Sequence, residues 1–268
     1  INVVLNNKKI ASNKLLKKFP CTPIHNTTFS FANASPDFRR KLLDRSAAIC
    51  DEQFLANWFA YYRALKQRNS TLKNNRISEI YAWNKQLIHY GNSLTKLRHL
   101  FFEKTLNNFR IILNSIGAMN VFDFLKHIEI SFFQGWEKNH TLLNILEDNI
   151  YNDKRRKTTL FGPHKSDIKF FINNIDAKQI LSRGEQKFFS ILWSCAQNEV
   201  LKKEYNIDPV LIIDDIKSEL DERVFDLLIK ILQHSKNQII FSCIDDTFSS
   251  KIADSLNQFK MFHVEQLR

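Results

Sequence analysis

The chain has 268 residues, of which 44% are hydrophobic, so it can form one large domain or two smaller ones and is too apolar to be disordered. Its 39 lysines and arginines against 28 aspartates and glutamates give a formal net charge of +11, which favours a polyanionic partner, nucleic acid before an anionic membrane. The sequence shows no membrane-spanning apolar run, no signal peptide and no cysteines at redox or zinc spacing, which indicates free thiols in a reducing cytoplasm.

The first 36 residues predict a β-rich start of the chain. Residues 1–19 read as strand, turn and strand, with Asn-Asn-Lys-Lys at positions 6–9 as the tip of a hairpin. Residues 20–36 are rich in loop-forming residues, and we expect one short strand among them.

From residue 37 to about residue 151 the apolar residues repeat at helical spacing, and we expect three to five helices, with 121–133 read as helical. Two of these helices show an apolar stripe with spacings of mostly three and four residues: Leu55, Phe59, Tyr62 and Leu65 in the first, and Leu94, Leu97, Phe101 and Leu106 in the second. Basic residues line the first helix, either as a solvated face or as a surface that faces DNA: Arg63, Lys66, Arg68, Lys73 and Arg76.

Beyond residue 152 the pattern changes to strands alternating with helices. The expected elements are a strand pair around a Gly-Pro turn in 158–172, a helix at 185–204, a buried parallel strand at 210–213, an amphipathic helix at 222–235, and strands at 238–244 (buried) and 261–266. In the amphipathic helix the inward residues are Val224, Phe225, Leu228 and Leu232. This order predicts an α/β fold with helices on the faces of a sheet, interrupted in sequence by the helical segment.

Two acids, Asp214 and Asp215, follow the buried strand directly. Open α/β sheets bind their ligands at the carboxyl ends of their strands, and Mg²⁺ on a nucleotide needs one or two carboxylates besides water and phosphate oxygens. We assign the metal to Asp214 and the attacking water to Asp215. An ordinary turn at the end of a strand is the alternative interpretation.

The helix that precedes this strand begins with a second candidate motif. Ser182 and Glu185 have the spacing of a capping box, and Gly184 lies between them. A helix N-terminus presents backbone N–H groups and a positive dipole end to an anion, and glycine permits a close approach. The motif therefore predicts a phosphate contact, with a well-capped structural helix as the alternative.

The two motifs stand in the order of the second half of an ABC-type ATPase: a serine-glycine signature, a buried strand with two acids, and an acidic loop at Ser218–Asp221. The chain resembles the RecF family of bacterial recombination mediators, which are ATPases related to the heads of SMC proteins. The matching motifs are SPDFRRKLLD (35–44), YYRALKQRN (61–69), TLFGPHKSD (159–167), LSRGEQK (181–187), LIIDDIKSELD (211–221) and MFHVE (261–265). Lys165 and Ser166 depart from the family, which usually has an arginine and an acid there.

The resemblance implies an α/β fold, the C-terminal part of an ABC/SMC-type ATPase head with a helical subdomain inserted. Residues 1–36 would be the remainder of the N-terminal ATPase lobe, which is β-rich. Residues 37–151 would be the helical subdomain, and residues 152–268 the C-terminal ATPase lobe with signature, Walker B and D-loop.

The resemblance also implies an ATP-dependent DNA-binding clamp, with ATP and Mg²⁺ as cofactors. It would close as a homodimer on gapped DNA and single-strand/double-strand junctions, with the partners RecR and RecO. The role is recombinational repair, replication restart and the SOS response, in the cytoplasm and away from membranes. The implied site residues are Asp215 as the catalytic base, Asp214 at the metal, and Ser182, Arg183, Gly184, Gln186 and Asp221 at the nucleotide.

A P-loop needs G-x-x-x-x-G-K-[ST], and none of the five glycines provides that spacing. In RecF-like proteins the P-loop precedes the hairpin that opens this sequence, so we expect a fragment or a truncated reading frame that does not hydrolyse ATP alone. Two other functions remain open. One is a remnant without a P-loop that binds DNA or a partner without catalysis, and the other is a metal-dependent nuclease using Asp214, Asp215 and Asp221.

Three further residues of the matching motifs have open roles. Arg39 and Arg40 match the paired arginines of the family. They either hold the helical segment to the sheet by ion pairs, or contact DNA or the dimer partner. His164, in the Gly-Pro-His motif, is interpreted as a structural turn residue rather than a catalyst.

Overall fold

The hairpin predicted at the start of the chain is present. The structure, a computed structural model, describes residues 3–10, 15, 17–25, 31–118, 122–214, 222–235, 237–242, 252 and 260–262. β1 (Val3–Leu5) pairs antiparallel with β2 (Lys8–Ile10). Asn6 and Asn7 form the turn with φ of 48° and 61°, a left-handed conformation that asparagine tolerates and that two-residue hairpin turns require.

A parallel sheet brings together one strand from the start of the chain and two strands from its last third. Its order is β3-β7-β8, formed by Cys21–Ile24, Val210–Asp214 and Ile239–Ser242. Leu211 and Ile213 of β7 are fully buried. The parallel strand predicted at 210–213 and the short strand predicted in 20–36 are confirmed. The strand predicted at 238–244 is confirmed by β8, but the expectation that it is buried is wrong, because Ile240 is 51% exposed at the edge of the described sheet.

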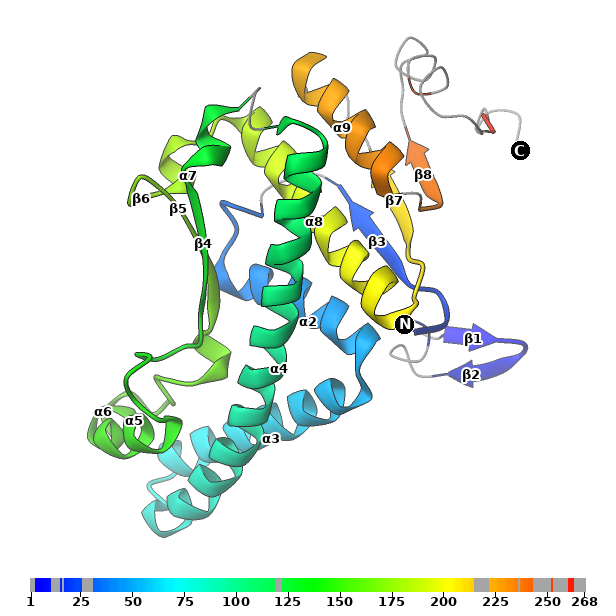
Figure 1. Ribbon diagram of the computed structural model, residues 1–268. Helices are drawn as coiled ribbons and strands as arrows, with labels where there is room; N and C mark the ends of the chain where they lie inside the picture. The colour runs from blue at the N-terminus through cyan, green and yellow to red at the C-terminus, as the bar shows by residue number, and fades with distance from the viewer. Residues whose placement is uncertain are drawn as a thin grey trace.

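Two helices pack beside this sheet as the sequence predicted (Figure 1). α8 (Arg183–Tyr205) contacts β3, and α9 (Glu222–Ser235) contacts α8. The inward residues predicted for α9 are all buried: Val224, Phe225, Leu228 and Leu232. The last predicted strand, 261–266, begins with Met261 and Phe262, which lie outside any strand, and its other residues fall outside the described part of the chain.

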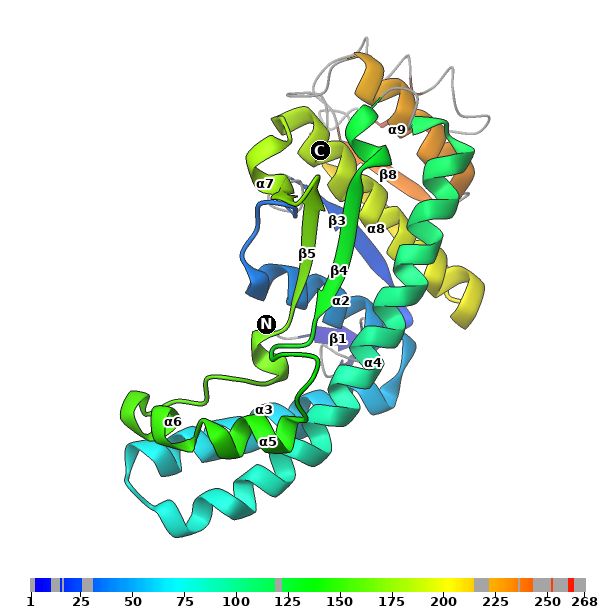
Figure 2. The same cartoon turned by 60° about the vertical axis from the view of Figure 1, so that its left-hand side comes forward.

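Most of the helical segment forms an arm that extends away from the parallel sheet (Figures 1 and 2), whereas its first helix packs against α8. Its described elements are α2 (Pro36–Cys50), α3 (Glu52–Lys73), the short 3-10 helix η2 (Ile77–Glu79), α4 (Ile80–Ser115), α5 (Leu142–Asp148) and α6 (Ile150–Arg156). α4 has 36 residues and is therefore about 54 Å long. It packs on α3 in the arm and on α8 beside the sheet, so this one helix joins the two parts.

The helix expected over 121–133 is wrong for most of its length. After a short 3-10 helix, η4 (Asp123–Lys126), the chain forms β4 (Ile128–Phe133), which pairs antiparallel with β5 (Asp167–Ile172). β5 continues to β6 (Ile175–Asp176), and Figure 2 shows β4 and β5 side by side along α4. The physical reason is the alternation Ile-Glu-Ile-Ser at 128–131, which has the two-residue period of a strand.

The strand pair expected around the Gly-Pro turn is also corrected. Residues 158–161 lie outside any strand, and the antiparallel partner of β5 is the distant β4. Gly162 has φ of 136°, and a Cβ atom there would lie 2.7 Å from the Tyr61 hydroxyl oxygen, so only glycine fits. It leads into a 3-10 helix, η5 (Pro163–Lys165), instead of a hairpin turn.

The apolar stripe predicted on α3 is confirmed at Leu65, which is buried, and is wrong at Phe59. Phe59 is 57% exposed, whereas Tyr61 and Arg68 on the opposite side are 1% and 0% exposed. Both sides of α3 carry large apolar residues, so spacing alone cannot choose the buried one. Arg68 belongs to the core, where its guanidinium donates to Asp153 and to the Thr159 hydroxyl, both at 2.7 Å. It is therefore no part of the basic surface assigned to this helix.

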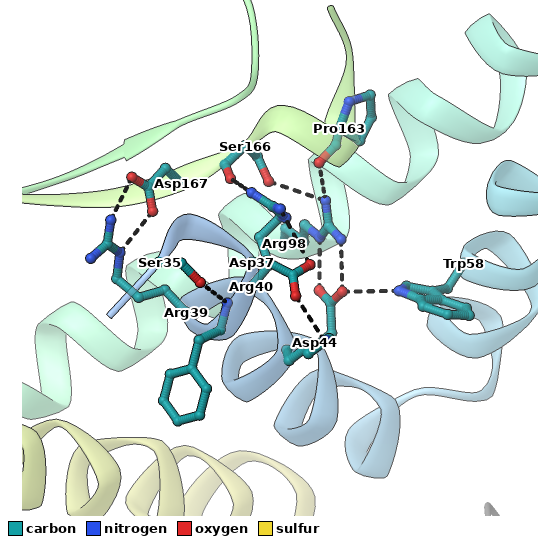
Figure 3. Close-up of polar contacts among 12 residues, drawn as sticks. Ser35, Asp37, Arg39, Arg40, Asp44, Trp58, Arg98, Pro163, Ser166 and Asp167 are labelled. Carbon is teal, nitrogen blue, oxygen red and sulfur yellow. Dashed lines mark hydrogen bonds and ion pairs between the residues drawn. The ribbon is translucent and has the colours of Figure 1, made fainter. Parts of the chain in front are cut away.

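A buried arginine joins the arm to the sheet region (Figure 3). Arg98 of α4 is 0% exposed, and two of its nitrogens donate to the two Asp44 carboxylate oxygens at 2.7 Å each. Its Nη1 also donates to the Pro163 carbonyl at 2.6 Å and to the Ser166 hydroxyl at 3.1 Å. Burial opposes the charged form, but the Asp44 carboxylate outweighs it and raises the pKa of Arg98. The charge therefore persists and fastens three segments together.

The division of the chain into three parts at residues 36 and 151 stays a prediction, although β4 of the middle part pairs with β5 of the last.

Among the helices of the described residues, none is both long and apolar enough to cross a membrane.

We predict that Asp44→Ala lowers the free energy of unfolding by about 3–5 kcal/mol, because it leaves the Arg98 guanidinium buried without its counter-ion. The Trp58 indole N–H, which donates to Asp44 at 2.9 Å, loses its acceptor as well. Chemical denaturation measures the change. Asp123→Ala is the control, since that carboxylate pairs with Lys126 in solvent, and it should leave the free energy of unfolding almost unchanged. A loss below about 1 kcal/mol for Asp44→Ala would contradict the role of this ion pair.

Candidate functional site

The predicted signature opens α8 with the capping box expected from the sequence. The Ser182 hydroxyl accepts from the Glu185 backbone N–H at 3.4 Å, and a Glu185 carboxylate oxygen accepts from the Ser182 N–H at 2.8 Å. Ser182 and Arg183 are exposed, and Gly184 is the second residue of the helix. The positive end of a 23-residue helix therefore lies at the surface with a hydroxyl, a guanidinium and a glycine around it.

Gln186 faces the interior of its own chain. Its amide nitrogen donates to the Leu181 carbonyl at 2.7 Å, and its amide oxygen accepts from the side-chain amide of Asn33. Both polar ends of the side chain are thus engaged. The structure brings Gln186 next to the other signature residues but gives it the position of a brace between α8 and the segment 31–35, and its predicted contact with a nucleotide stays a prediction.

The segment 31–35 is in turn held by Arg39, whose contact with Asp167 is drawn in Figure 3. The Arg39 guanidinium donates to the carbonyls of Ala32 and Ala34 at 3.3 and 2.6 Å, and to both Asp167 carboxylate oxygens at 2.8 Å. Arg40 donates to the Ser166 carbonyl at 2.6 Å. These contacts confirm the first of the two roles left open, that of fastening the helical segment to strand β5 and its approach.

Asp214, the predicted metal ligand, is the last residue of β7, and it is exposed. Its carboxylate accepts from the hydroxyl of Ser242, its register partner on β8. Because α8 turns back through residues 206–209 into β7, the start of α8 and the end of β7 point toward the same side of the molecule (Figure 1). Asp215 and Asp221 lie outside the described residues, so their predicted roles stay predictions.

The residues at this edge suit a magnesium ion that is held mainly by its nucleotide. In the described part of the chain, no three His, Cys, Asp or Glu side chains are grouped closely enough to form a metal site of their own. Mg²⁺ usually keeps several waters and takes one or two carboxylates beside substrate phosphates. A single exposed carboxylate at the end of a strand, as Asp214 provides, fits that requirement.

The Gly-Pro-His motif forms a turn that packs against α3 and α4. His164 Nε2 lies 3.0 Å from the Thr159 carbonyl, which can only accept, so this nitrogen carries the proton. Nδ1 then accepts from the Tyr61 hydroxyl at 2.7 Å. Burial lowers the pKa of His164 to about 4, so the ring is neutral at pH 7. Both nitrogens are occupied, which supports the structural role predicted for this histidine.

The sequence analysis missed the residues that connect these motifs, above all Asp44, Arg98 and Asp167. One signal was available for Arg98. It lies four residues after Leu94 and three before Phe101, on the same apolar stripe, and a charged residue at such a position requires a buried partner. The partners themselves lie 54 and more residues away in sequence.

We predict that the free energy of unfolding falls as the pH is lowered through the window between about 6.5 and 4. The unfolded state binds a proton at His164 in this window and the folded state does not, because its pKa is lowered, so acid favours unfolding. The His164 contribution lost between pH 7 and pH 5 is about 2 kcal/mol.

The measurement is chemical denaturation across this pH range, with His164→Gln as the test variant and His89→Gln, at an exposed position on α4, as its control. The His164 variant should be less stable at pH 7 but show a smaller pH dependence. A pH dependence that is unchanged in His164→Gln would contradict the assignment.

Known proteins resemble this chain in sequence and in structure. No protein-family model matches it. The DNA replication and repair protein RecF of Shewanella frigidimarina is 30% identical over 270 residues, which are 99% of this chain and 72% of that protein. The RecF of Shewanella denitrificans is 32% identical over 259 residues, 95% of this chain and 69% of that protein. The chain thus spans about 70% of the length of these relatives.

The likeness extends to a solved structure of the recombination mediator protein RecF-ATP in the RecFOR pathway. It superposes on this chain with a TM-score of 0.74 at 25% identity, over 90% of this chain and 66% of the other. The architecture described above is therefore the α/β fold of an ABC/SMC-type ATPase head.

Proposed function

The chain belongs to the RecF family, and on this premise we propose that it works as part of an ATP-dependent DNA-binding clamp in recombinational DNA repair and replication restart. The proposed ligands are ATP with Mg²⁺, and gapped DNA or junctions of single and double strands. The proposed partners are a second copy of the protein, RecR and RecO. Such a function belongs in the cytoplasm, where the DNA of a bacterium lies.

One observation carries the proposal: an exposed, glycine-containing helix start lies on the side of the molecule where a parallel strand ends in an exposed carboxylate. In a symmetric dimer, the anion-binding helix start of one subunit and the metal-binding carboxylate of the other would together meet the two needs of one nucleotide. The RecF-ATP structure supports ATP as that nucleotide, and the names of the relatives support a role in DNA repair. The formal net charge of +11 agrees with DNA as the partner.

In this proposal the residues of the chain divide the work at the nucleotide. Ser182 and Gly184 present a hydroxyl and the backbone of the first helical turn to a phosphate held by the partner subunit, and Arg183 adds a positive charge. Asp214 holds the Mg²⁺, which neutralises charge on the phosphates when it is bound. Asp215 orients and deprotonates the attacking water, and Asp221 contacts the nucleotide from the loop that follows. Gln186 and Asn33 keep the helix start in place.

We predict that the purified 268-residue chain does not hydrolyse ATP by itself, because its sequence has no G-x-x-x-x-G-K-[ST] loop to hold the β-phosphate. Release of inorganic phosphate measures this. Turnover that disappears in the Asp215→Asn variant would contradict the prediction and show a complete site within these residues. The metal-dependent nuclease gains no support from the described residues, where no acidic cluster occurs.

The role of the signature is tested in a chimaera that joins the amino-terminal segment of the Shewanella frigidimarina relative to this chain. We predict that the chimaera dimerises on addition of ATP and that Ser182→Arg abolishes this dimer, because a long side chain blocks the approach of a phosphate to α8. Analytical ultracentrifugation with and without ATP gives the readout.

The matched control is Thr141→Arg, which replaces the N-cap of α5 in the arm. Both substitutions remove a helix cap that is worth about 1 kcal/mol, so they disturb folding to a similar extent. ATP-dependent dimers in the Ser182→Arg variant, at the level of the Thr141→Arg control, would rule out the signature role. A chimaera that never dimerises but still binds DNA would favour the module without catalysis.

A further inference from the structure

One face of α3 is exposed along most of its length. Phe59, Arg63, Lys66 and Lys73 follow one another at spacings of four, three and seven residues, which places them on a single face of the helix. All four are exposed, and the opposite face is the one that buries Tyr61 and Arg68. We call these four residues the outer face of α3. It is about 21 Å long from Phe59 to Lys73.

The outer face carries positive charge that no acidic residue in the described ranges neutralises. From Gln53 to Lys73, α3 contains no acidic residue. Arg68 is the basic residue of this helix that is compensated, by Asp153 at 2.7 Å on the buried side. Within the described part of the chain, no ion pair involves Arg63, Lys66 or Lys73. The face thus presents a row of three cations to a partner.

An aromatic ring stands at one end of this row. Phe59 is 57% exposed, and its ring packs edge-on against Trp58, with centroids 5.3 Å apart. Trp58 is itself fixed by its hydrogen bond to Asp44. Ala56 and Ala60 lie beside Phe59 on the same surface, with Arg63 and Lys66 next to them. The small alanines leave the helix surface open beside the ring.

This combination selects a partner with phosphates in a row and flat apolar groups between them. We propose that the outer face of α3 binds a single-stranded segment of DNA, with its backbone on Arg63, Lys66 and Lys73 and a base stacked on Phe59. A duplex offers its phosphates but keeps its bases stacked inside, so it would leave Phe59 unused. An acidic peptide would match the charges but has no regular supply of flat rings.

The inference rests on the proposed function in that it takes DNA as the partner, and it adds which strand is bound and where. It needs no nucleotide and no dimer. The length of the face suits a site at the short end of the ~4–16 nucleotides that single-strand binding modules cover.

The test uses the 268-residue chain and a fluorescent 20-residue oligothymidylate, with affinity followed by fluorescence anisotropy from low to physiological salt. Arg63→Gln with Lys66→Gln should weaken binding and reduce the slope of log K against log salt by about 1.4, about 0.7 for each lost single-strand phosphate contact. Phe59→Ala should weaken binding about tenfold and leave that slope unchanged, since stacking is uncharged.

The controls are matched in chemistry and exposure. Lys8→Gln with Lys9→Gln removes two exposed cations from the hairpin β1–β2, and Phe262→Ala removes a phenylalanine that is 67% exposed elsewhere. Neither should change the affinity by more than about twofold. Thermal unfolding of each variant checks that the fold is retained, which is expected because all these side chains lie at the surface.

Four outcomes would overturn the inference. The first is a wild-type chain that does not bind the oligonucleotide, and the second is a set of α3 variants that bind like the controls. The third is a Phe59→Ala variant with full affinity, which would indicate a surface that binds only the DNA backbone, as for a duplex. The fourth is a polyglutamate peptide that competes for the chain as well as DNA does. The dimerisation test in the chimaera is independent. If the unsubstituted chimaera fails to dimerise with ATP while the α3 variants lose DNA affinity as expected, the clamp is refuted and the α3 surface stands. If the chimaera dimerises but the α3 variants keep full affinity, the α3 surface is refuted and the clamp stands.

Discussion

The fork of Arg98 on Asp44 is the contact on which the arrangement of the arm and the sheets depends. A guanidinium that is fully buried must satisfy its donors within the protein, and Arg98 does so with Asp44 of α2, the Pro163 carbonyl and the Ser166 hydroxyl. Asp44 lies on α2, whereas Pro163 and Ser166 both belong to the Gly-Pro-His turn. Because α4 extends from the arm to α8, this single side chain fixes α2 and the Gly-Pro-His turn against the helix that carries the whole arm.

From this point the contacts continue toward the proposed nucleotide site. Ser166 is followed by Asp167, whose two carboxylate oxygens accept from Nε and Nη2 of Arg39. Arg39 also donates to the carbonyls of Ala32 and Ala34. Asn33, between those two residues, donates to Gln186 at the start of α8. The signature and the arm are therefore built on shared supports. A rearrangement of α2 would therefore shift both the signature and the arm. Such a shared support is the physical condition for coupling between DNA bound at the arm and a nucleotide bound at α8. Coupling itself requires two populated conformations of this support.

The sequence predicted best where one local rule decided the outcome. The capping box at Ser182 and the apolar strand before Asp214 depend on neighbours along the chain, and both are as expected. The prediction failed where two local patterns competed. Residues 128–133 followed a helical stretch and were read as helix, although their alternation fits a strand that pairs with residues 167–172. α3 offered two apolar faces, and its contacts with α4, α2 and α6 choose between them.

The same long-range contacts decide what the net charge means. Arg39, Arg68 and Arg98 meet Asp167, Asp153 and Asp44 within the protein, so these three arginines contribute structure and no net field. A formal charge of +11 cannot distinguish them from cations that face solvent, because composition counts both alike. Once the buried pairs are removed, the excess charge belongs to surface residues, and α3 shows the separation within one helix. Its paired arginine points into the core, and its unpaired cations lie on the opposite side beside an exposed ring. That division, more than the total charge, is the reason to expect a polyanion on the arm.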